Sequence, residues 1–477
     1  MATVRDPSPE AIAAQQDCAM LDALMAGTAA MRAAGPTFLP KWPNESQDAY
    51  DARLKSSVLF SAYSRTVSVL TGKPFSKPVT LGDATPEWLI EWAENIDLQG
   101  RDLHAFAAAI CQACLSHGFA GILVEYPVAT NLRTVAEEKA AGVRPYFVQI
   151  ASHQILGWQS RRIAGAETLT QIRFLEFAQE PDGRFHSRDV EQVRVLEPGR
   201  WEIWRRDPNE LDLEKAWKLF EEGATSLPII PFVPVYGERV CFMRGKPPLI
   251  DLAHLNVRHW QSQSDQDTIL HVARVPILFG QNLVDTKLTV GASTMISGDA
   301  DSDLKYVEHS GKAIEAGAKS ILQLEDQMRQ IGAELLVVKP GNITVSQTVA
   351  DNEPGTCALQ RIIQDQEDAL EQALGLMCDW VKRPADIEVE IWQDFGVSDM
   401  PAATFDSLIK MAAAGLISRQ TLFAEAQRRG IVQPERTWPE EIARLAASHP
   451  EPDGDEGKLG PGDGDADNIA ASGSDAA

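Results

Sequence analysis

The stretch from Pro247 to Arg383 constrains the fold most, because helical and extended patterns alternate in it in an unusual order. Its first predicted helix, Leu249 to Arg274, is apolar at both ends. The middle of that helix, Gln261 to Thr268, contains no apolar side chain at all. A helix that is polar on every side for two turns is not expected to lie on a monomer core. We therefore expect this segment to span open space, to pair with copies of itself, or to line a wet channel.

A second helix follows with a single narrow apolar stripe at helical spacing. Its small or apolar residues recur every three or four positions: Ile314, Gly317, Ile321, Leu324, Met328, Ile331 and Leu335. Such a stripe suits one neighbouring helix better than a broad core. Between the two helices, Val275 to Ser310 has strand-like pieces at 275–279 and 304–307. The chain is therefore predicted to run out along one helix and to return along the other.

Composition and charge limit the classes of protein to which the chain can belong. Its 477 residues allow two or three domains, and 44% hydrophobic with 23% charged residues is typical of a soluble globular protein. The formal net charge of -24 disfavours unspecific binding to nucleic acid phosphates. Part of that charge lies after Pro450, in a Gly/Asp/Ala/Ser-rich segment that we expect to be disordered. Six cysteines in so long a chain are typical of free thiols in a reducing compartment.

Two sequence features bear on targeting and membranes. The start, Met1 to Pro7, lacks the apolar segment of a secretory signal. Leu103 to Val124 carries no charged residue and is long enough to cross a bilayer, but Gly118 and Gly121 interrupt it. We predict a buried helix at 103–117 that turns at Gly118 into a strand at 122–126, and no membrane partner.

The remaining patterns predict a mixed fold. Residues 8–33 are helical in pattern, and Asn44 to Ser46 cap a helix that ends at Gly72. From Ile122 to Val240, period-two runs separated by turn signals predict an antiparallel β-rich region. A long helix then follows Pro354, with an apolar face through Leu359, Ile363, Leu370, Ala373, Met377 and Trp380 and an acidic face opposite.

Motifs that would indicate catalysis are absent from the sequence. None of the Gly-Lys pairs fits a P-loop, and neither a Gly-x-Ser-x-Gly elbow nor a His-Glu-x-x-His helix occurs. Cys111 and Cys114 lack the second ligand pair that structural zinc needs, so they are interpreted as buried core residues. His254, His259 and His271 do not share a helix face. We expect no metal, no cofactor and no enzymatic activity.

Leu408 to Gly430 leaves one alternative open, a helix-turn-helix with Arg419, Arg428 and Arg429 as phosphate contacts. A small helical pair with a solvated basic end is the simpler interpretation, because an acidic chain with no other basic stripe is a poor repressor.

Four stretches, taken in their order along the chain, resemble the portal (head-to-tail connector) proteins of tailed bacteriophages, and more narrowly a portal family catalogued mainly from sequence. These stretches are Phe38 to Glu45 (FLPKWPNE) with Tyr50 and Arg53, Gly118 to Pro127 (GFAGILVEYP), Arg144 to Phe147 (RPYF), and Pro247 to Asn256 (PPLIDLAHLN). The resemblance covers roughly residues 36–432 and rests on packing and turn signatures.

This resemblance implies an α+β fold with a β-rich wing, a two-helix stem, a small α/β clip, a long helix behind a tunnel loop, and a helical C-terminal crown. The implied segments are 1–246 for the N-terminal region and wing, 247–274 for the first stem helix, 275–310 for the clip, 311–335 for the second stem helix, 336–354 for the tunnel loop, 355–400 for the long helix and a wing strand, 401–449 for the crown-side helices, and 450–477 for a disordered acidic tail.

The resemblance also implies partners and a location. The chain would form a ring, usually of twelve copies, at one capsid vertex of the virion, after assembly in the host cytoplasm. Double-stranded DNA would pass through the ring in packaging and ejection. The ring would contact the major capsid protein, the large terminase and then a head-tail adaptor. The competing hypotheses are a phage-encoded DNA-processing enzyme, such as a nuclease, and a helix-turn-helix regulator.

Candidate residues follow from combining these interpretations. Acidic stem residues suit a channel through which a polyanion slides without sticking, since each wall cation would trap phosphate. The channel-lining candidates are Asp265, Asp267, Glu325 and Asp326. The tunnel-loop candidates are Lys339, Asn342, Thr344 and Ser346. The subunit-packing candidates are Ile314, Ile321, Leu324, Met328, Ile331 and Leu335.

Overall fold

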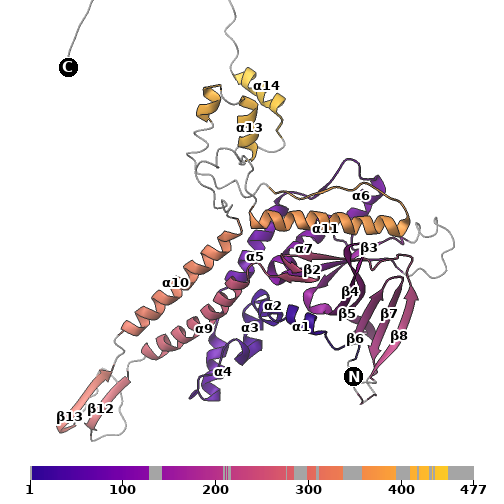
Figure 1. Ribbon diagram of the computed structural model, residues 1–477. Coiled ribbons are helices and arrows are strands. Elements are labelled where there is room, and N and C mark those ends of the chain that lie inside the picture. Colours follow the sequence, from indigo (N-terminus) through magenta and orange to yellow (C-terminus); the bar gives the residue numbers. More distant parts are fainter. Residues whose placement is uncertain are drawn as a thin grey trace, which may run out of the picture. The chain divides into compact units, whose positions relative to one another are not determined.

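The computed structural model has an α+β fold, as predicted, and divides into two compact units, Met1–Gly396 and Val397–Ala477 (Figure 1). The structure describes residues 3–127, 142–207, 210, 212, 216–274, 277–283, 298–307, 311–336, 357–393, 409–415, 418–428, 432 and 436–448. The elements below belong to the first unit unless stated otherwise.

Short helices open the chain in place of the longer ones expected from the sequence. The bounds are α1 Pro9–Ala14, α2 Cys18–Ala26, α3 Thr28–Ala34, α4 Gln47–Ser56, α5 Ala62–Gly72 and α6 Glu87–Ala93. Ser46 caps α4 as predicted, because its side chain accepts a hydrogen bond from the Ala49 amide. The helix predicted to end at Gly72 is two helices, since residues 57–61 are not helical and Val58 among them is exposed.

The apolar stretch at 103–124 forms a buried helix and a buried strand, as predicted. Helix α7 spans Leu103–His117, and Gly118 ends it with a φ of +77°. A Cβ at Gly118 would lie 2.3 Å from the Lys246 carbonyl carbon, so both the φ and the space there require glycine. Strand β2 (Phe119–Glu125) follows at once. Among the described residues, no helix combines the length and the apolar character needed to cross a membrane.

Two antiparallel sheets make up the predicted β-rich region. A three-stranded sheet has the order β3-β2-β9, with β3 at Tyr146–Ala151 and β9 at Phe232–Tyr236. A five-stranded meander has the order β4-β5-β6-β7-β8. Its strands span Ile155–Ile163, Ala166–Asp182, His186–Glu197, Arg200–Arg206 and Trp217–Ala224. A further hairpin pairs β10 (Glu238–Cys241) with β11 (Arg244–Lys246).

The stretch from Pro247 to Arg383 has the predicted order of helix, excursion, helix and long helix. Helix α9 spans Ile250–Ala273, α10 spans Lys312–Glu334, and α11 spans Ala358–Val381. Strands β12 (Ile277–Leu283) and β13 (Gly298–Val307) pair antiparallel between the first two helices, with Ile277 opposite Val307. Figure 1 shows α9 and α10 running side by side, with this hairpin at their far end.

Helix α11 packs with its predicted apolar face on the core and holds a short strand on its acidic face. It contacts β9, β2 and α7. The Glu367 and Glu371 carboxylates accept hydrogen bonds from the Ile391 and Val389 amides, at 2.6 and 2.9 Å. The strand within 355–400 is the short β14 (Val389–Glu390), which pairs with β1 (Thr80–Leu81).

The main core joins helices that are far apart in sequence. Fully buried side chains from α2, α5, α7, α9 and α11 meet in it, for example Leu24, Tyr63, Phe106, Trp260 and Leu370. A second core lies between the two sheets and contains Phe119, Phe174 and Phe232. In the second unit, α13 (Arg419–Arg428) and α14 (Trp438–Ser448) pack through the rings of Phe423 and Trp438.

Candidate functional site

The candidate site is the pair of long helices α9 and α10 together with the residues that fix the pair to the rest of its unit. At the far part of the pair, the Gln266 side-chain amide donates a hydrogen bond to the Ile314 carbonyl at 2.9 Å. A Cβ at Gly317 would lie 2.1 Å from Gln266 Oε1, so only glycine leaves room for this bridge. Gly317 belongs to the small and apolar stripe seen in the sequence, and its role is close approach of the two helices.

The polar middle of α9 is partly packed within the chain, which corrects the expectation that it avoids the chain's own core. Ser264 and Gln266 are buried, at 2% and 6% exposure. The Ser264 and Ser57 hydroxyls lie 2.9 Å apart, and the Gln261 amide donates to the Phe38 carbonyl at 3.0 Å. Polar groups can be buried here because each finds a hydrogen-bond partner.

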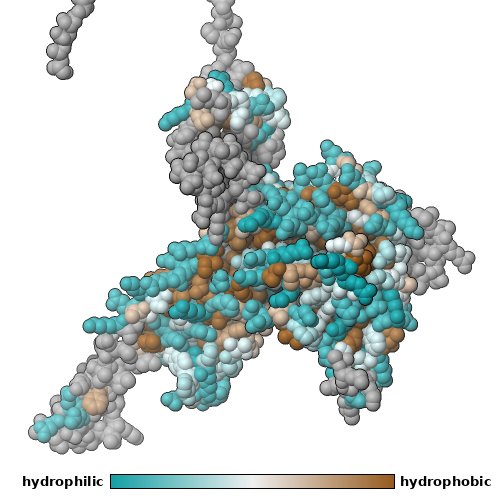
Figure 2. All heavy atoms as spheres, in the orientation of Figure 1, coloured by the Kyte–Doolittle hydropathy of each residue, from teal (hydrophilic) through white to brown (hydrophobic). Residues whose placement is uncertain are grey.

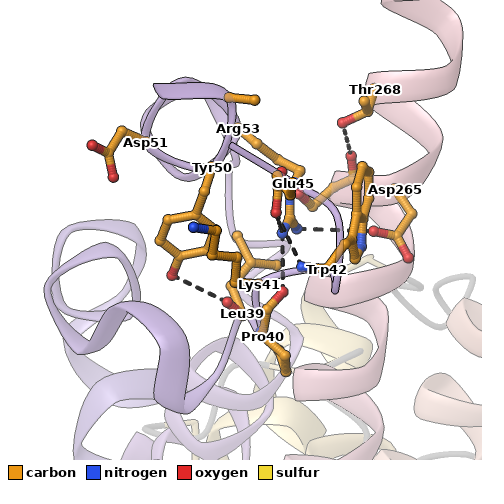
Figure 3. Close-up of polar contacts among 12 residues, drawn as sticks. Leu39, Pro40, Lys41, Trp42, Glu45, Tyr50, Asp51, Arg53, Asp265 and Thr268 are labelled. Atoms are coloured by element: carbon orange, nitrogen blue, oxygen red, sulfur yellow. Dashed lines mark hydrogen bonds and ion pairs between the residues drawn. The ribbon is translucent and has the colours of Figure 1, made fainter. Parts of the chain in front are cut away.

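Arg53 ties the N-terminal region to this part of α9 (Figure 3). Its guanidinium and the Glu45 carboxylate are both 4% exposed and form two hydrogen bonds of 2.7 Å. A third bond of 2.9 Å reaches the Pro40 carbonyl, and Asp265 of α9 lies 3.9 Å from Nη1. The guanidinium also lies over the Trp42 ring, 4.3 Å from its centroid. We call Arg53, Glu45, Trp42 and Asp265 the arginine anchor.

Sequence reasoning noted Arg53, Glu45 and Trp42 only as part of a resemblance and did not predict the anchor. Glu45 precedes the N-cap Ser46 and Arg53 stands in the last turn of α4, so their contact over eight residues follows no local spacing rule that the sequence could have shown. A second anchor was also missed. The buried Asn256 side chain accepts from the Tyr63 amide at 2.9 Å and donates to the Phe60 carbonyl at 2.8 Å, which joins α9 to the start of α5.

The four acidic candidates do not form one cluster. Asp265 is half exposed; burial raises its pKa, and the Arg53 guanidinium opposes that effect. Asp267 is exposed and accepts a hydrogen bond from Gln263 at 2.8 Å. Asp326 is 68% exposed and pairs with Arg329 at 2.7 Å.

Glu325 lies between His259 of α9 and Arg329 of its own helix, which is 3.4 Å away. Its side chain is 22% exposed and lies 3.6 Å from Nε2 of His259. The His259 ring is buried and stands 5.1 Å from the Phe60 ring. Burial lowers the pKa of His259, and the Glu325 carboxylate opposes this shift. The pair therefore belongs to the packing between α9 and α10.

The apolar stripe of α10 packs largely within the chain, which leaves three of the six subunit-packing candidates little surface for contacts between copies. Ile321, Leu324 and Met328 are 7%, 4% and 2% exposed, and Met328 is part of the main core. Ile314, Ile331 and Leu335 are half-buried, and the last two pack against the same core. The helix instead exposes Leu322, at 60%. Figure 2 shows hydrophilic residues over much of this helix pair, with hydrophobic ones where the pair joins the rest of its unit.

Several predicted positions remain outside the described residues. These are Lys339, Asn342, Thr344 and Ser346 of the predicted tunnel loop, and the segment after residue 448. In the region suggested as a helix-turn-helix, residues 409–413 and α13 are helical around Ala414 and Gly415, as predicted.

The cysteines of α7 are structural. Cys111 and Cys114 are buried as predicted, and burial raises the pKa of Cys111 to about 12, so this thiol is inert. No group of potential metal ligands occurs in the described part of the chain.

One arrangement that the sequence did not suggest is a row of Ser116, His117 and Asp22. The Ser116 hydroxyl lies 2.8 Å from Nδ1 of His117, whose Nε2 lies 3.0 Å from Asp22. However, Ser116 is 2% exposed and donates its hydroxyl proton to the Gln112 carbonyl at 2.7 Å. A nucleophile needs access to its substrate and a free hydroxyl, so this row is structural.

One family model matches the part of the chain that contains the helix pair. The family model described as "Domain of unknown function (DUF4055)" matches residues 248–381, from α9 to α11. No curated protein sequence matches the chain.

Solved structures similar to the chain come from particles of a gene transfer agent (GTA). "Neck of empty GTA particle computed with C6 symmetry" is 13% identical with a TM-score of 0.38, over 75% of this chain and 87% of that one. "Neck of native GTA particle computed with C12 symmetry" is 10% identical with a TM-score of 0.36, over the same shares. "Virion of native gene transfer agent (GTA) particle" is 11% identical with a TM-score of 0.37, over 84% of this chain and 98% of that one.

Proposed function

We propose that this chain is a portal protein, the subunit of a ring-shaped channel at one capsid vertex through which double-stranded DNA is packaged and ejected. The observation that carries the proposal is the excursion α9, β12–β13, α10, which leaves the core as one helix of 24 residues and returns as another of 23. An antiparallel helix pair of this length with mostly polar outer faces does not form a core by itself. Pairs from several neighbouring copies, placed side by side in a ring, would enclose a channel. Its role would be structural and not enzymatic.

The partners and the place of action follow from this role as further parts of the proposal. Twelve copies of the chain would form the ring in the host cytoplasm. In the virion the ring would contact the major capsid protein. The large terminase would dock first and the head-tail adaptor afterwards, both at the side of the hairpin β12–β13.

The charge on the helix pair fits passage of DNA. Of the four acidic candidates, Asp267 is exposed and we propose it as a channel-facing group. Asp326 is also exposed, but it is paired with Arg329 and lies one turn from Leu322 on the same face of α10, so it is a weaker candidate. The side chain of Asp265 is half exposed and can also face the channel, whereas Glu325 lies against His259 and is a weaker candidate. Sparse positive charge along the wall lets a polyanion slide, because fewer phosphate contacts form and fewer counterions are released.

Contacts between copies require apolar surface that the chain itself leaves uncovered. Because α10 buries its stripe internally, we propose that Leu322 meets a neighbouring copy. Val69 of α5, at 61% exposure, is a second candidate, since α10 meets the same helix where Gly332 approaches Thr66. An exposed leucine and valine gain by burial about 1.5–3 kcal/mol each.

Electron microscopy of the purified full chain tests the proposal. We expect closed rings with a central hole, and Leu322→Lys should reduce them because it places a charge in the contact. Gln323→Lys is the matched control, since it adds the same charge at an adjacent exposed position of α10. A protein that stays monomeric at high concentration, or that cleaves DNA with divalent metal or binds a specific operator as a dimer, would refute the portal assignment.

A further inference from the structure

A histidine lies in the packing between α9 and α10 without a hydrogen-bond partner. His259 is 2% exposed, and neither of its ring nitrogens makes a hydrogen bond. The Oε1 atom of Glu325 on α10 lies 3.6 Å from Nε2, which is longer than a hydrogen bond. A neutral imidazole carries one N–H donor and one acceptor, and buried groups of this kind are normally paired. His259 is therefore an exception within a core that otherwise pairs its polar groups in this region.

The charged groups around the ring are few. Glu325 is the charged side chain of α10 that lies against it, and Glu325 is shared with Arg329, 3.4 Å away. The segment 57–61, which places the Phe60 ring 5.1 Å from the imidazole, holds no ionisable side chain. On α9, the residues one turn before and after His259 are uncharged, namely Leu255, Asn256, Ser262 and Gln263.

The charged groups of the helices that flank segment 57–61 are paired elsewhere or exposed. In α4, Arg53 is paired with Glu45, and the other charged residues of this helix are exposed. In α5, the Tyr63 hydroxyl donates to the Ser116 carbonyl, and Arg65 is exposed. The charge that bears on the ring therefore comes from α10.

Burial and charge act on His259 in opposite directions, and burial dominates. Burial lowers the pKa of His259 from its ordinary value of 6.5, because the charged imidazolium would lose its hydration, and Glu325 offsets part of this shift. When α10 separates from α9, the ring reaches water and its pKa returns toward 6.5. Below that pH the separated state takes up a proton more readily than the packed state. The packing is therefore strongest above pH 6.5 and weakens as the pH falls from there toward the folded-state pKa.

We propose that His259 is a pH-sensitive switch, which holds α10 against α9 while it is neutral and releases α10 when it takes up a proton in mildly acidic solution. The other contacts between these helices are the apolar stripe of α10 and the Gln266 bridge to the Ile314 carbonyl, and neither contains a group that titrates. The inference goes beyond the proposed channel and does not depend on ring formation, since every residue involved belongs to one chain.

Thiol labelling of the full chain measures the separation of the two helices. Ile321→Cys places a thiol on the buried stripe of α10, and Ser320→Cys places one on its exposed side as the reference. Both chains also carry Cys241→Ser, because the other native cysteines are buried. Dithiodipyridine reacts with both thiols, and the rate at the buried position divided by the rate at the exposed one gives the fraction of chains in which α10 has separated. Leu324→Cys, 4% exposed, is a second buried reporter in case Ile321→Cys does not fold.

The rates are compared at about pH 7.5 and about pH 5.5, one pH unit to either side of the ordinary histidine pKa of 6.5. We expect the rate ratio to rise several-fold in acid. The rise should be at most about tenfold, because the uptake of one proton supplies no larger factor over this interval.

Three variants separate the effect of His259 from other titrating groups. His259→Gln removes the titrating ring and should abolish the rise. His254→Gln is the same change at an exposed position of α9, and as the matched control it should leave the rise unchanged. Glu325→Gln removes the carboxylate that offsets burial, so the pKa of His259 falls further and the rise should be larger than in the parent.

Three results would overturn the proposal: a rate ratio that does not change with pH in the parent, an equal rise in His259→Gln and the parent, or a smaller rise in Glu325→Gln. A ratio that falls in acid would overturn it as well, because it would show that a charged His259 pairs with Glu325 and holds the helices together.

Discussion

At the residue scale, Arg53 shows what a buried charge requires. Its guanidinium, 4% exposed, contacts the Glu45 carboxylate, the Pro40 carbonyl and the Trp42 ring, with Asp265 of α9 nearby. Removing one member of such a pair leaves the other buried without its partner, which costs more than the pair itself contributes. The anchor is therefore the place where a single substitution should affect α9 most.

We expect Glu45→Gln to lower the free energy of unfolding by about 3 kcal/mol, because it leaves the Arg53 charge buried and half paired. Chemical denaturation followed by circular dichroism measures this loss. Asp48→Asn, at an exposed position of α4, is the control and should change stability by less than about 0.5 kcal/mol. Equal effects of the two substitutions would mean that the anchor does not stabilise the fold.

The same pair predicts a pH dependence. Hydrogen bonds from Arg53 hold the pKa of Glu45 below its usual value of 4.5. The folded chain therefore binds this proton less readily than the unfolded chain, and the stabilisation is fully present above pH 4.5 and is lost as the pH falls through the folded-state pKa. The stability difference between the parent and Glu45→Gln should be constant near neutral pH and shrink below pH 4.5 in denaturation curves. A difference that persists to low pH would contradict the assigned charge state.

At the element scale, the helix pair depends on the contact between Gly317 and Gln266. A methyl group at 317 would displace the Gln266 side chain and break its bond to the Ile314 carbonyl. Alanine is otherwise a better helix former than glycine by about 1 kcal/mol. Whether Gly317→Ala raises or lowers the free energy of unfolding should therefore depend on which residue stands at position 266.

We expect Gly317→Ala to destabilise the parent by about 1 kcal/mol and to stabilise a Gln266→Ala variant by up to about 1 kcal/mol. A double-mutant cycle of denaturation midpoints measures this coupling. Ala316→Gly, at an exposed position of α10, reports helix propensity alone and should cost about 1 kcal/mol in both backgrounds. The same sign for Gly317→Ala in both backgrounds would show that the two residues are independent.

The elements of this helical unit were more predictable than their surroundings. The periods of Leu249 to Arg274 and of Ile314 to Leu335, and the strands between them, are local signals, and α9, β12, β13 and α10 match them closely. What each helix packs against depends on residues distant in sequence, so the α10 stripe was assigned to a neighbouring copy when Met328 reaches the chain's own core. The polar middle of α9 was misjudged for the same reason, since Ser57 and Phe38 supply its partners.

At the scale of the whole molecule, a ring of identical acidic chains must overcome its own repulsion. Each copy carries a net charge of -24, and eight acids against one lysine after Pro450 account for -7 of it. Salt shortens the range of this repulsion to about 10 Å at 0.1 M. The free energy gained by burying Leu322 between copies is not weakened by salt. We therefore expect the ring fraction, measured by sedimentation velocity, to rise between low and moderate salt. A chain that ends at His449 should form rings at a lower salt concentration, because it lacks the segment that carries a net charge of -7. Rings that dissociate as salt rises would instead show that ion pairs hold the copies together, and the apolar contact proposed at Leu322 would be wrong.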